Sequence, residues 1–236
     1  MTLEELVNTG LSIYDEYHPQ QAVDDDLKEM VKTFIKRHIN EFLCMLPSNC
    51  LNDDIVVNVN HQDVANAITL IDYRGICIDL TTLEKKFLKL VSFRLENWER
   101  AVYAEDVINS DNPRRKLQEN KYTSGKVSRP VVSIENVRGK KSLCAWGYTG
   151  TDYNVNDLTY IRELNSTKEL LTLPDYLLTA YIYYVLYYLF NTVQELRLAE
   201  NSLIQMQSLL SLHNIYPTMP VEFTETKKKK EVKDND

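Results

Sequence analysis

A run of uncharged residues near the C-terminal end limits what this chain can fold into. Residues 176–190, YLLTAYIYYVLYYLF, carry no charge, and six of these fifteen residues are tyrosine. A membrane-spanning helix needs about 20 mostly apolar residues, and membrane proteins keep tyrosine mainly at the bilayer surface. The flanking residues Asp175 and Glu195 are acidic. The run therefore predicts a helix buried by protein on nearly all sides, whose hydroxyl groups bond to neighbouring elements of the same chain or of other subunits.

Two helices are predicted before this run, at the N-terminal end. Thr2 and Glu5 have the spacing of a capping box, which predicts a helix that continues to about Tyr17. A second helix of five turns is predicted before Pro47, because apolar residues recur there at helical spacing. These residues are Leu27, Met30, Val31, Phe34, Ile35, Ile39, Phe42 and Leu46.

Two further helices are predicted at the C-terminal end. Pro174 suits the first turn of the tyrosine helix, where proline is tolerated. Thr192 and Glu195 have the spacing of a second capping box, so a new helix or a bend is expected there. Apolar residues continue at helical spacing to Leu210, and the prolines of IYPTMP, residues 215–220, end the pattern. The charged residues that follow predict a solvated tail.

The region between these helices is rich in β-forming residues. Alternation of apolar and polar residues is clearest at 76–80 and 91–95. Residues 85–104 fit a strand or a helix, and we favour the strand. The predicted class is α+β, a mainly α-helical four-helix bundle with an inserted small β-rich domain and an extended C-terminal tail. The expected boundaries are 1–50 and 166–215 for the bundle helices, 51–165 for the insertion and 216–236 for the charged tail.

The sequence offers few groups for a catalytic or metal site. It has six glycines and neither a GxGxxG nor a GxxxxGK[ST] motif for binding phosphate. The four histidines, His18, His38, His61 and His213, are scattered, without a partner motif for nucleophilic or metal chemistry. The acids at 24–26 could hold a divalent cation, although acids at a helix start are favourable without one. We therefore expect no enzymatic activity, no cofactor and no metal.

Cysteine spacing and charge exclude further classes. The four cysteines, Cys44, Cys50, Cys77 and Cys144, lack metal-type spacing, which predicts reduced structural thiols in a cytosolic protein. The N-terminus has no basic region followed by an apolar run, so no signal peptide is expected. The net charge of −7 argues against general nucleic-acid binding, which needs a basic surface.

Two segments have the composition of contact surfaces. Residues 112–122, NPRRKLQENKY, are either a solvated loop or a basic patch that meets an acidic partner. The basic residues of this segment are Arg114, Arg115, Lys116 and Lys121. Trp98 and Arg100 belong to residue types that are enriched at interface hot spots, although tryptophan is also a common core residue.

The order of these elements resembles that of the head–tail connector, or adaptor, proteins of short-tailed bacteriophages. Connectors return from a β-rich insertion through a strand and a proline-started helix, and residues 158–190, LTYIRELNSTKELLTLPDYLLTAYIYYVLYYLF, follow this order. The polar helix TVQELRLAENSLIQMQSLL comes next. Residues 87–130, which begin FLKLVSFRLENWERAV, are similar to the strand-and-loop segment of connectors in the crAss-like phages of gut Bacteroides. The resemblance covers roughly residues 2–213 and includes no catalytic motif.

The resemblance implies a structural virion protein without enzymatic activity. Such proteins form a ring, usually a dodecamer, below the portal, join the capsid to the tail and line the DNA ejection channel. The implied partners are other copies of the chain, the portal protein, the next tail or ring protein, and passing DNA that is not bound sequence-specifically; no membrane is involved. The implied location is the head–tail junction of the virion, and the host cytoplasm during assembly. An acidic channel wall would repel phosphates and let the duplex slide.

Connector rings also suggest a role for the tail, because their terminal arms often reach into neighbouring rings. The resemblance implies Val221 and Phe223 as apolar anchors, with the lysines meeting an acidic groove. These lysines are Lys227, Lys228, Lys229 and Lys230. The other hypotheses are a different ring or tail-completion component, a cytosolic non-enzymatic helical binding or regulatory module, and a small hydrolase.

Overall fold

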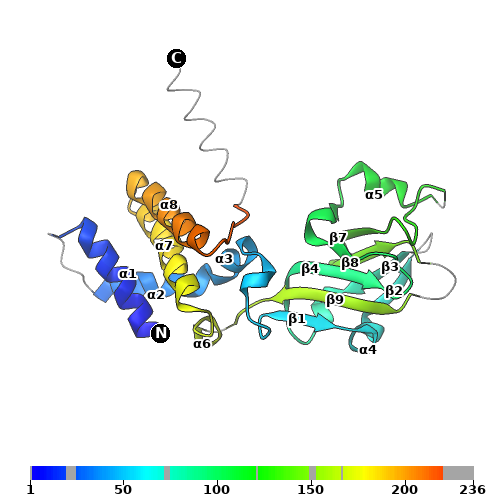
Figure 1. Cartoon of the computed structure of the whole chain (residues 1–236), viewed down its shortest axis with the longest axis horizontal. Coiled ribbons are helices and arrows are strands. Elements are labelled where there is room, and N and C mark those ends of the chain that lie inside the picture. The colour runs from blue at the N-terminus through cyan, green and yellow to red at the C-terminus, as the bar shows by residue number, and fades with distance from the viewer. Residues whose placement is uncertain are drawn as a thin grey trace, which may run out of the picture. The chain divides into compact units, whose positions relative to one another are not determined.

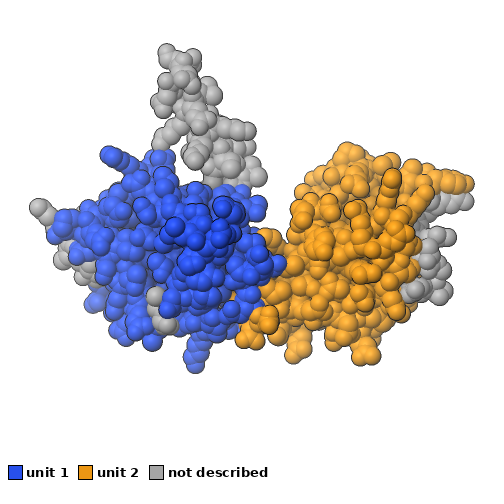
Figure 2. All heavy atoms as spheres, in the orientation of Figure 1, with its two compact units in different colours: residues 1–52, 164–236 blue, residues 53–163 orange. Residues whose placement is uncertain are grey.

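The chain folds into two compact units, which are coloured separately in Figure 2 and drawn as ribbons in Figure 1. The helical unit contains residues 1–52 and 164–236, and the β unit contains residues 53–163. This computed structural model describes residues 2–19, 25–71, 75–120, 122–148, 153–165 and 167–219.

The predicted class, a mainly α-helical four-helix bundle with a small insertion, is wrong. The described residues form eight α-helices and nine strands, and the strands make two sheets with a hydrophobic core of their own. The β region, which follows the N-terminal helices and precedes the C-terminal ones, is therefore a compact unit of nearly half the chain. The prediction placed this β-rich region at 51–165, and the alternation at 76–80 marked β3 (Gly75–Asp79), but it gave the region too small a part in the fold.

The tyrosine helix, α7, lies at the centre of the helical unit (Figure 1). The elements of this unit are α1 (Leu3–Tyr17), α2 (Asp25–Arg37), α3 (Ile39–Met45), α6 (Thr167–Leu170), α7 (Asp175–Thr192) and α8 (Leu196–Leu212). Helices α1, α2, α3 and α8 all pack against α7, and ten of its residues are buried. The predicted buried helix is thus confirmed, and its neighbours belong to the same chain. None of the described helices is both long enough and apolar enough to cross a membrane.

Hydroxyl groups on α7 bond to protein groups, as predicted. The Tyr181 hydroxyl donates a hydrogen bond of 2.5 Å to the carbonyl oxygen of Ile35, in the last turn of α2. The hydroxyls of Tyr184 and Tyr188 lie 3.1 Å apart, and Tyr188 also donates to a Glu41 carboxylate oxygen at 3.2 Å. These bonds satisfy polar groups that would otherwise be costly to bury.

The N-terminal helices differ in one respect from the prediction. The capping box of Thr2 and Glu5 is present at the start of α1. The single helix predicted from residue 27 to 46 is instead divided into α2 and α3 at His38. The His38 ring stacks on Tyr188 at a centroid distance of 3.7 Å, and its Nδ1 atom lies 2.6 Å from Glu41 Oε2. Contacts with α7 therefore hold the chain at the break.

The second predicted capping box, at Thr192 and Glu195, is absent. Glu195 precedes α8 without a side-chain cap, and Gln194 has a φ of 64° that turns the chain. The Thr192 hydroxyl donates to the carbonyl oxygen of Tyr188, and Glu195 Oε1 lies 2.9 Å from His18 Nε2 at the end of α1. Both side chains are therefore engaged elsewhere.

The β unit consists of two sheets. The four-stranded sheet has the order β1 (Val56–Val59), β9 (Val155–Arg162), β4 (Phe87–Leu95) and β5 (Val102–Tyr103), all antiparallel. The five-stranded sheet has the order β2 (Ile68–Ile71), β3 (Gly75–Asp79), β8 (Lys140–Trp146), β7 (Val131–Val137) and β6 (Ile108–Asn109), antiparallel except for β6 with β7. Short helices α4 (His61–Val64) and α5 (Pro113–Leu117) lie in the connections. The strand favoured within residues 85–104 is confirmed as β4 and β5.

The buried tyrosines predict a loss of stability in alkali. Burial raises the pKa of Tyr181 and of Tyr184 well above the usual value of 10, so the unfolded chain loses protons first as the pH rises. Their stabilising effect is complete below about pH 10, and above it the free energy of unfolding should fall by about 1.4 kcal/mol per pH unit for each tyrosine. Urea unfolding followed by far-UV circular dichroism, between about pH 10 and 12, measures this slope.

Tyr184→Phe should reduce the slope by about 1.4 kcal/mol per pH unit, because one titrating group is removed. The matched control is Tyr103→Phe, since Tyr103 is 52% exposed, and it should leave the slope unchanged. An identical slope for Tyr184→Phe and the unaltered protein would contradict the prediction.

Candidate interaction site

The basic segment predicted at residues 112–122 forms α5 and the start of a loop that leads to β7. Asn112 caps the helix, since its side chain accepts a hydrogen bond from the Arg114 amide at 2.9 Å, and Pro113 occupies the first helical position. Both features favour a helix start at this point. Residues 113–117 of the segment thus form a short helix of the β unit and not a loop.

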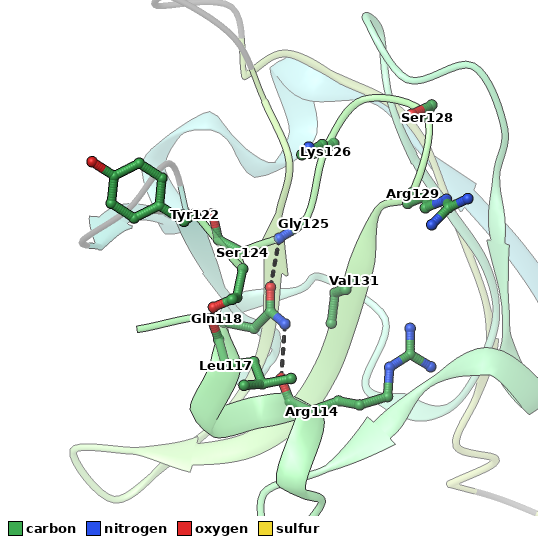
Figure 3. Close-up of a pocket in the computed structure, with 11 residues that line it drawn as sticks. Arg114, Leu117, Gln118, Tyr122, Ser124, Gly125, Lys126, Ser128, Arg129 and Val131 are labelled. Carbon is green, nitrogen blue, oxygen red and sulfur yellow. Dashed lines mark hydrogen bonds between the residues drawn. The ribbon is translucent and has the colours of Figure 1, made fainter. Parts of the chain in front are cut away.

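Gln118 fixes the loop after α5. Its side chain is buried, its Nε2 atom donates to the Arg114 carbonyl at 2.7 Å, and its Oε1 atom accepts from the Gly125 amide at 2.7 Å (Figure 3). A Cβ atom on Gly125 would lie 2.6 Å from the carbonyl oxygen of Trp146, so only glycine permits this approach to β8. The loop is therefore held in place before any ligand binds.

A cavity of about 470 Å³ lies between α5 and this loop. Three cations line it, Arg114, Lys126 and Arg129, and none of the described residues lining it is acidic. The guanidinium groups of Arg114 and Arg129 lie on the same side of Val131 and turn toward each other (Figure 3). Hydroxyl groups complete the polar lining, from Tyr122, Thr123, Ser124 and Ser128. We call this cavity the basic pocket.

Arg115 does not take part in the basic pocket, although it neighbours Arg114 in sequence. Its Nε atom donates to both carboxylate oxygens of Glu135, at 2.9 and 3.2 Å, and Glu135 also accepts from Ser133. The Arg115 guanidinium lies over the Trp146 ring, 4.7 Å from its centroid. Arg115 therefore attaches α5 to the sheet, and the predicted grouping of Arg114, Arg115 and Lys116 is divided between two roles.

The structure contradicts the prediction of reduced thiols for one cysteine pair. Cys77 and Cys144 are direct partners in the antiparallel pairing of β3 with β8 and form a disulfide. Their sequence separation of 67 residues concealed the pairing, because only the strand register brings them together. With Trp146 and Arg115 they line a second cavity of about 480 Å³.

The other predicted contact residues have different positions. Trp98 is 1% exposed in the core of the β unit, where its Nε1 atom donates to the Gly147 carbonyl at 3.2 Å, so it is no surface contact in this chain. Arg100 and Lys116 are exposed. The remaining predicted contact residues lie outside the described residues, as does Asp24. They are Lys121, Val221, Phe223, Lys227, Lys228, Lys229 and Lys230. The described residues contain no group of three potential metal ligands.

Sequence reasoning missed Lys126, Arg129 and Gln118. Lys126 and Arg129 follow the basic segment after a turn-like stretch and pair with each other through their backbones. The available signal was a continuing excess of basic residues to position 129 in an acidic chain.

Compared with known proteins, the chain matches no family model, no curated protein and no solved structure.

Trp98 provides a test of the core assignment. Trp98→Ala should lower the free energy of unfolding by about 3–5 kcal/mol, because it leaves a cavity between the sheets. Arg100→Ala, two residues away and exposed, should change it by less than about 0.5 kcal/mol. Urea unfolding monitors both, and a Trp98→Ala protein as stable as the unaltered one would contradict the assignment.

The disulfide predicts a reductant-sensitive stability. It closes a loop of 67 residues, so its reduction should lower the free energy of unfolding by about 4 kcal/mol in the chain-entropy treatment. Thermal unfolding with and without reductant measures the effect. The control is the double variant Cys77→Ser, Cys144→Ser, which should not respond to reductant. Titration of four thiols in the denatured, unreduced protein would contradict the disulfide.

Proposed function

We propose that this chain is a structural, non-enzymatic virion protein of the head–tail connector type. In this role it forms a ring of identical subunits below the portal, joins the capsid to the tail and surrounds the path of the ejected DNA. The observation that carries the proposal is the order of the two units along the chain. The helical unit is interrupted after residue 52 by the whole β unit, and the chain returns through β9 and the short helix α6 to Pro174, which precedes α7. This is the order of elements in the connectors that the sequence resembles.

Burial of α7 by its own chain changes which surfaces are available for assembly. A ring is not needed to cover the tyrosine helix, because α1, α2, α3 and α8 already do so. Apolar side chains are instead exposed on α8 and just beyond it. These are Leu196 at 63%, Ile204 at 54%, Leu212 at 77% and Tyr216 at 71% exposure. We propose that another protein covers some of this apolar surface in the assembly.

The second candidate is a non-enzymatic binding module that acts alone or as a dimer in the cytosol. The basic pocket favours it, because a preformed pocket on a stable unit suits a binding protein of any kind. The two candidates differ in whether assembly depends on a portal. The test must therefore measure ring formation in the presence and absence of the portal protein.

The experiment is to mix the purified full chain with the portal protein from the same genome and to image the product by electron microscopy. The connector proposal expects a ring of this chain on the portal. Leu212→Glu should reduce ring formation at least tenfold, because a charge would be buried where an apolar group was covered. The matched control is Ser208→Glu, an exposed polar site on the same helix. Failure to bind the portal would favour the binding module.

A further inference from the structure

We propose that the basic pocket binds an acidic segment of a protein partner, with Arg114 and Arg129 pairing with a carboxylate and Lys126 with a second acidic group. The proposal concerns the isolated chain and does not depend on the connector role. It also replaces the grouping suggested by the sequence, because Arg115 is already paired with Glu135.

The pocket concentrates positive charge in one place. Arg114 comes from α5 and Arg129 from the end of the loop, and their guanidinium groups turn toward each other (Figure 3). Within the described residues, Arg114, Lys126 and Arg129 form no salt bridge, although Arg115 forms two. Neighbouring like charges repel, and an anion between them removes the repulsion. A carboxylate matches the planar fork of a guanidinium and can accept two hydrogen bonds from it.

The pocket is also built before binding. Gln118 joins the carbonyl of Arg114 to the amide of Gly125, and Gly125 lies against the backbone of Trp146. Gly147 has a φ of 119°, and a Cβ atom there would lie 2.8 Å from the carbonyl oxygen of Lys126. Both ends of the loop therefore have fixed backbone contacts. A site ordered in advance loses little conformational entropy when its ligand binds.

The surroundings favour a short acidic peptide over a long polyanion. The whole chain carries a net charge of −7. Two exposed acidic residues also lie close to the loop: Glu119 precedes it in sequence, and the Glu99 amide donates a hydrogen bond to the Val127 carbonyl. A DNA duplex would bring many phosphates near these acids. Leu117 and Tyr122, 50% and 77% exposed, also line the pocket and offer apolar surface next to the cations. A peptide that carries acidic and apolar side chains complements both.

The test is fluorescence anisotropy of the full chain with the labelled peptide Ser-Asp-Leu-Glu-Asp-Ser at low ionic strength. The neutral peptide Ser-Asn-Leu-Gln-Asn-Ser should not bind. Arg129→Glu should weaken binding by tenfold or more, since it removes hydrogen bonds between charged groups and adds repulsion. The matched control is Arg197→Glu, which makes the same charge change at an exposed position of α8 and should alter the affinity by no more than twofold. Arg129→Lys should give an intermediate loss, because the charge remains but the fork does not.

Three outcomes would overturn the proposal. The first is equal affinity for the acidic and neutral peptides, or no binding of either. The second is displacement of the acidic peptide by inorganic phosphate at a lower concentration than by acetate, which would assign the pocket to a phosphate group. The third is binding of duplex DNA at physiological salt that is lost in Arg129→Glu. Circular dichroism of each variant establishes that it is folded, and none of these outcomes bears on ring formation with the portal.

Discussion

The helical unit depends on one constraint, which is that the hydroxyl groups of a buried tyrosine helix must find hydrogen-bond partners away from water. Tyr181 finds its partner in the carbonyl oxygen of Ile35. Ile35 lies in the last turn of α2, where carbonyl oxygens lack a partner within the helix, so this bond satisfies such a group. The chain divides into α2 and α3 at His38, whose ring stacks on Tyr188. The tyrosines of α7 thus contact the point where an earlier helix ends.

The β unit has a comparable dependence on its five-stranded sheet. One face of this sheet contributes to the core that contains Trp98, and the other face carries Trp146 with the Cys77–Cys144 disulfide. Arg115 packs over Trp146 and anchors α5, while the end of β8 supports the loop through Gly125. The basic pocket therefore rests on a covalently cross-linked sheet. Contacts of Gln118 and Gly125 hold the backbone that carries its cations, whose side chains are exposed and available to a ligand.

The sequence predicted those features that depend on local order. The capping box of α1, the buried helix α7 and the strand β4 were each visible within about 20 residues. The break at His38 was not, because it depends on Tyr181 and Tyr188, which lie about 150 residues later in the chain. The disulfide depends on strand register, which the sequence does not show. The different roles of Arg114 and Arg115 depend on the two side chains pointing to different sides of a short helix. The four-helix bundle failed because the sequence shows a β-rich region at 51–165 but not how its strands pair, and it is their pairing that makes two sheets around a core of their own.

The exposed apolar residues of α8 and the basic pocket would have different effects in an assembly. Apolar area is non-directional and supplies affinity roughly in proportion to the surface removed from water. Charge pairing in a pocket adds less affinity but rejects partners that lack the complementary acid, and it increases the rate of encounter. In a ring of identical subunits each copy uses one surface to bind and another to be bound, so partner choice must be specific or open chains form. If both proposals hold, a preformed basic pocket in an acidic protein would supply such specificity, because contacts between acidic surfaces repel each other.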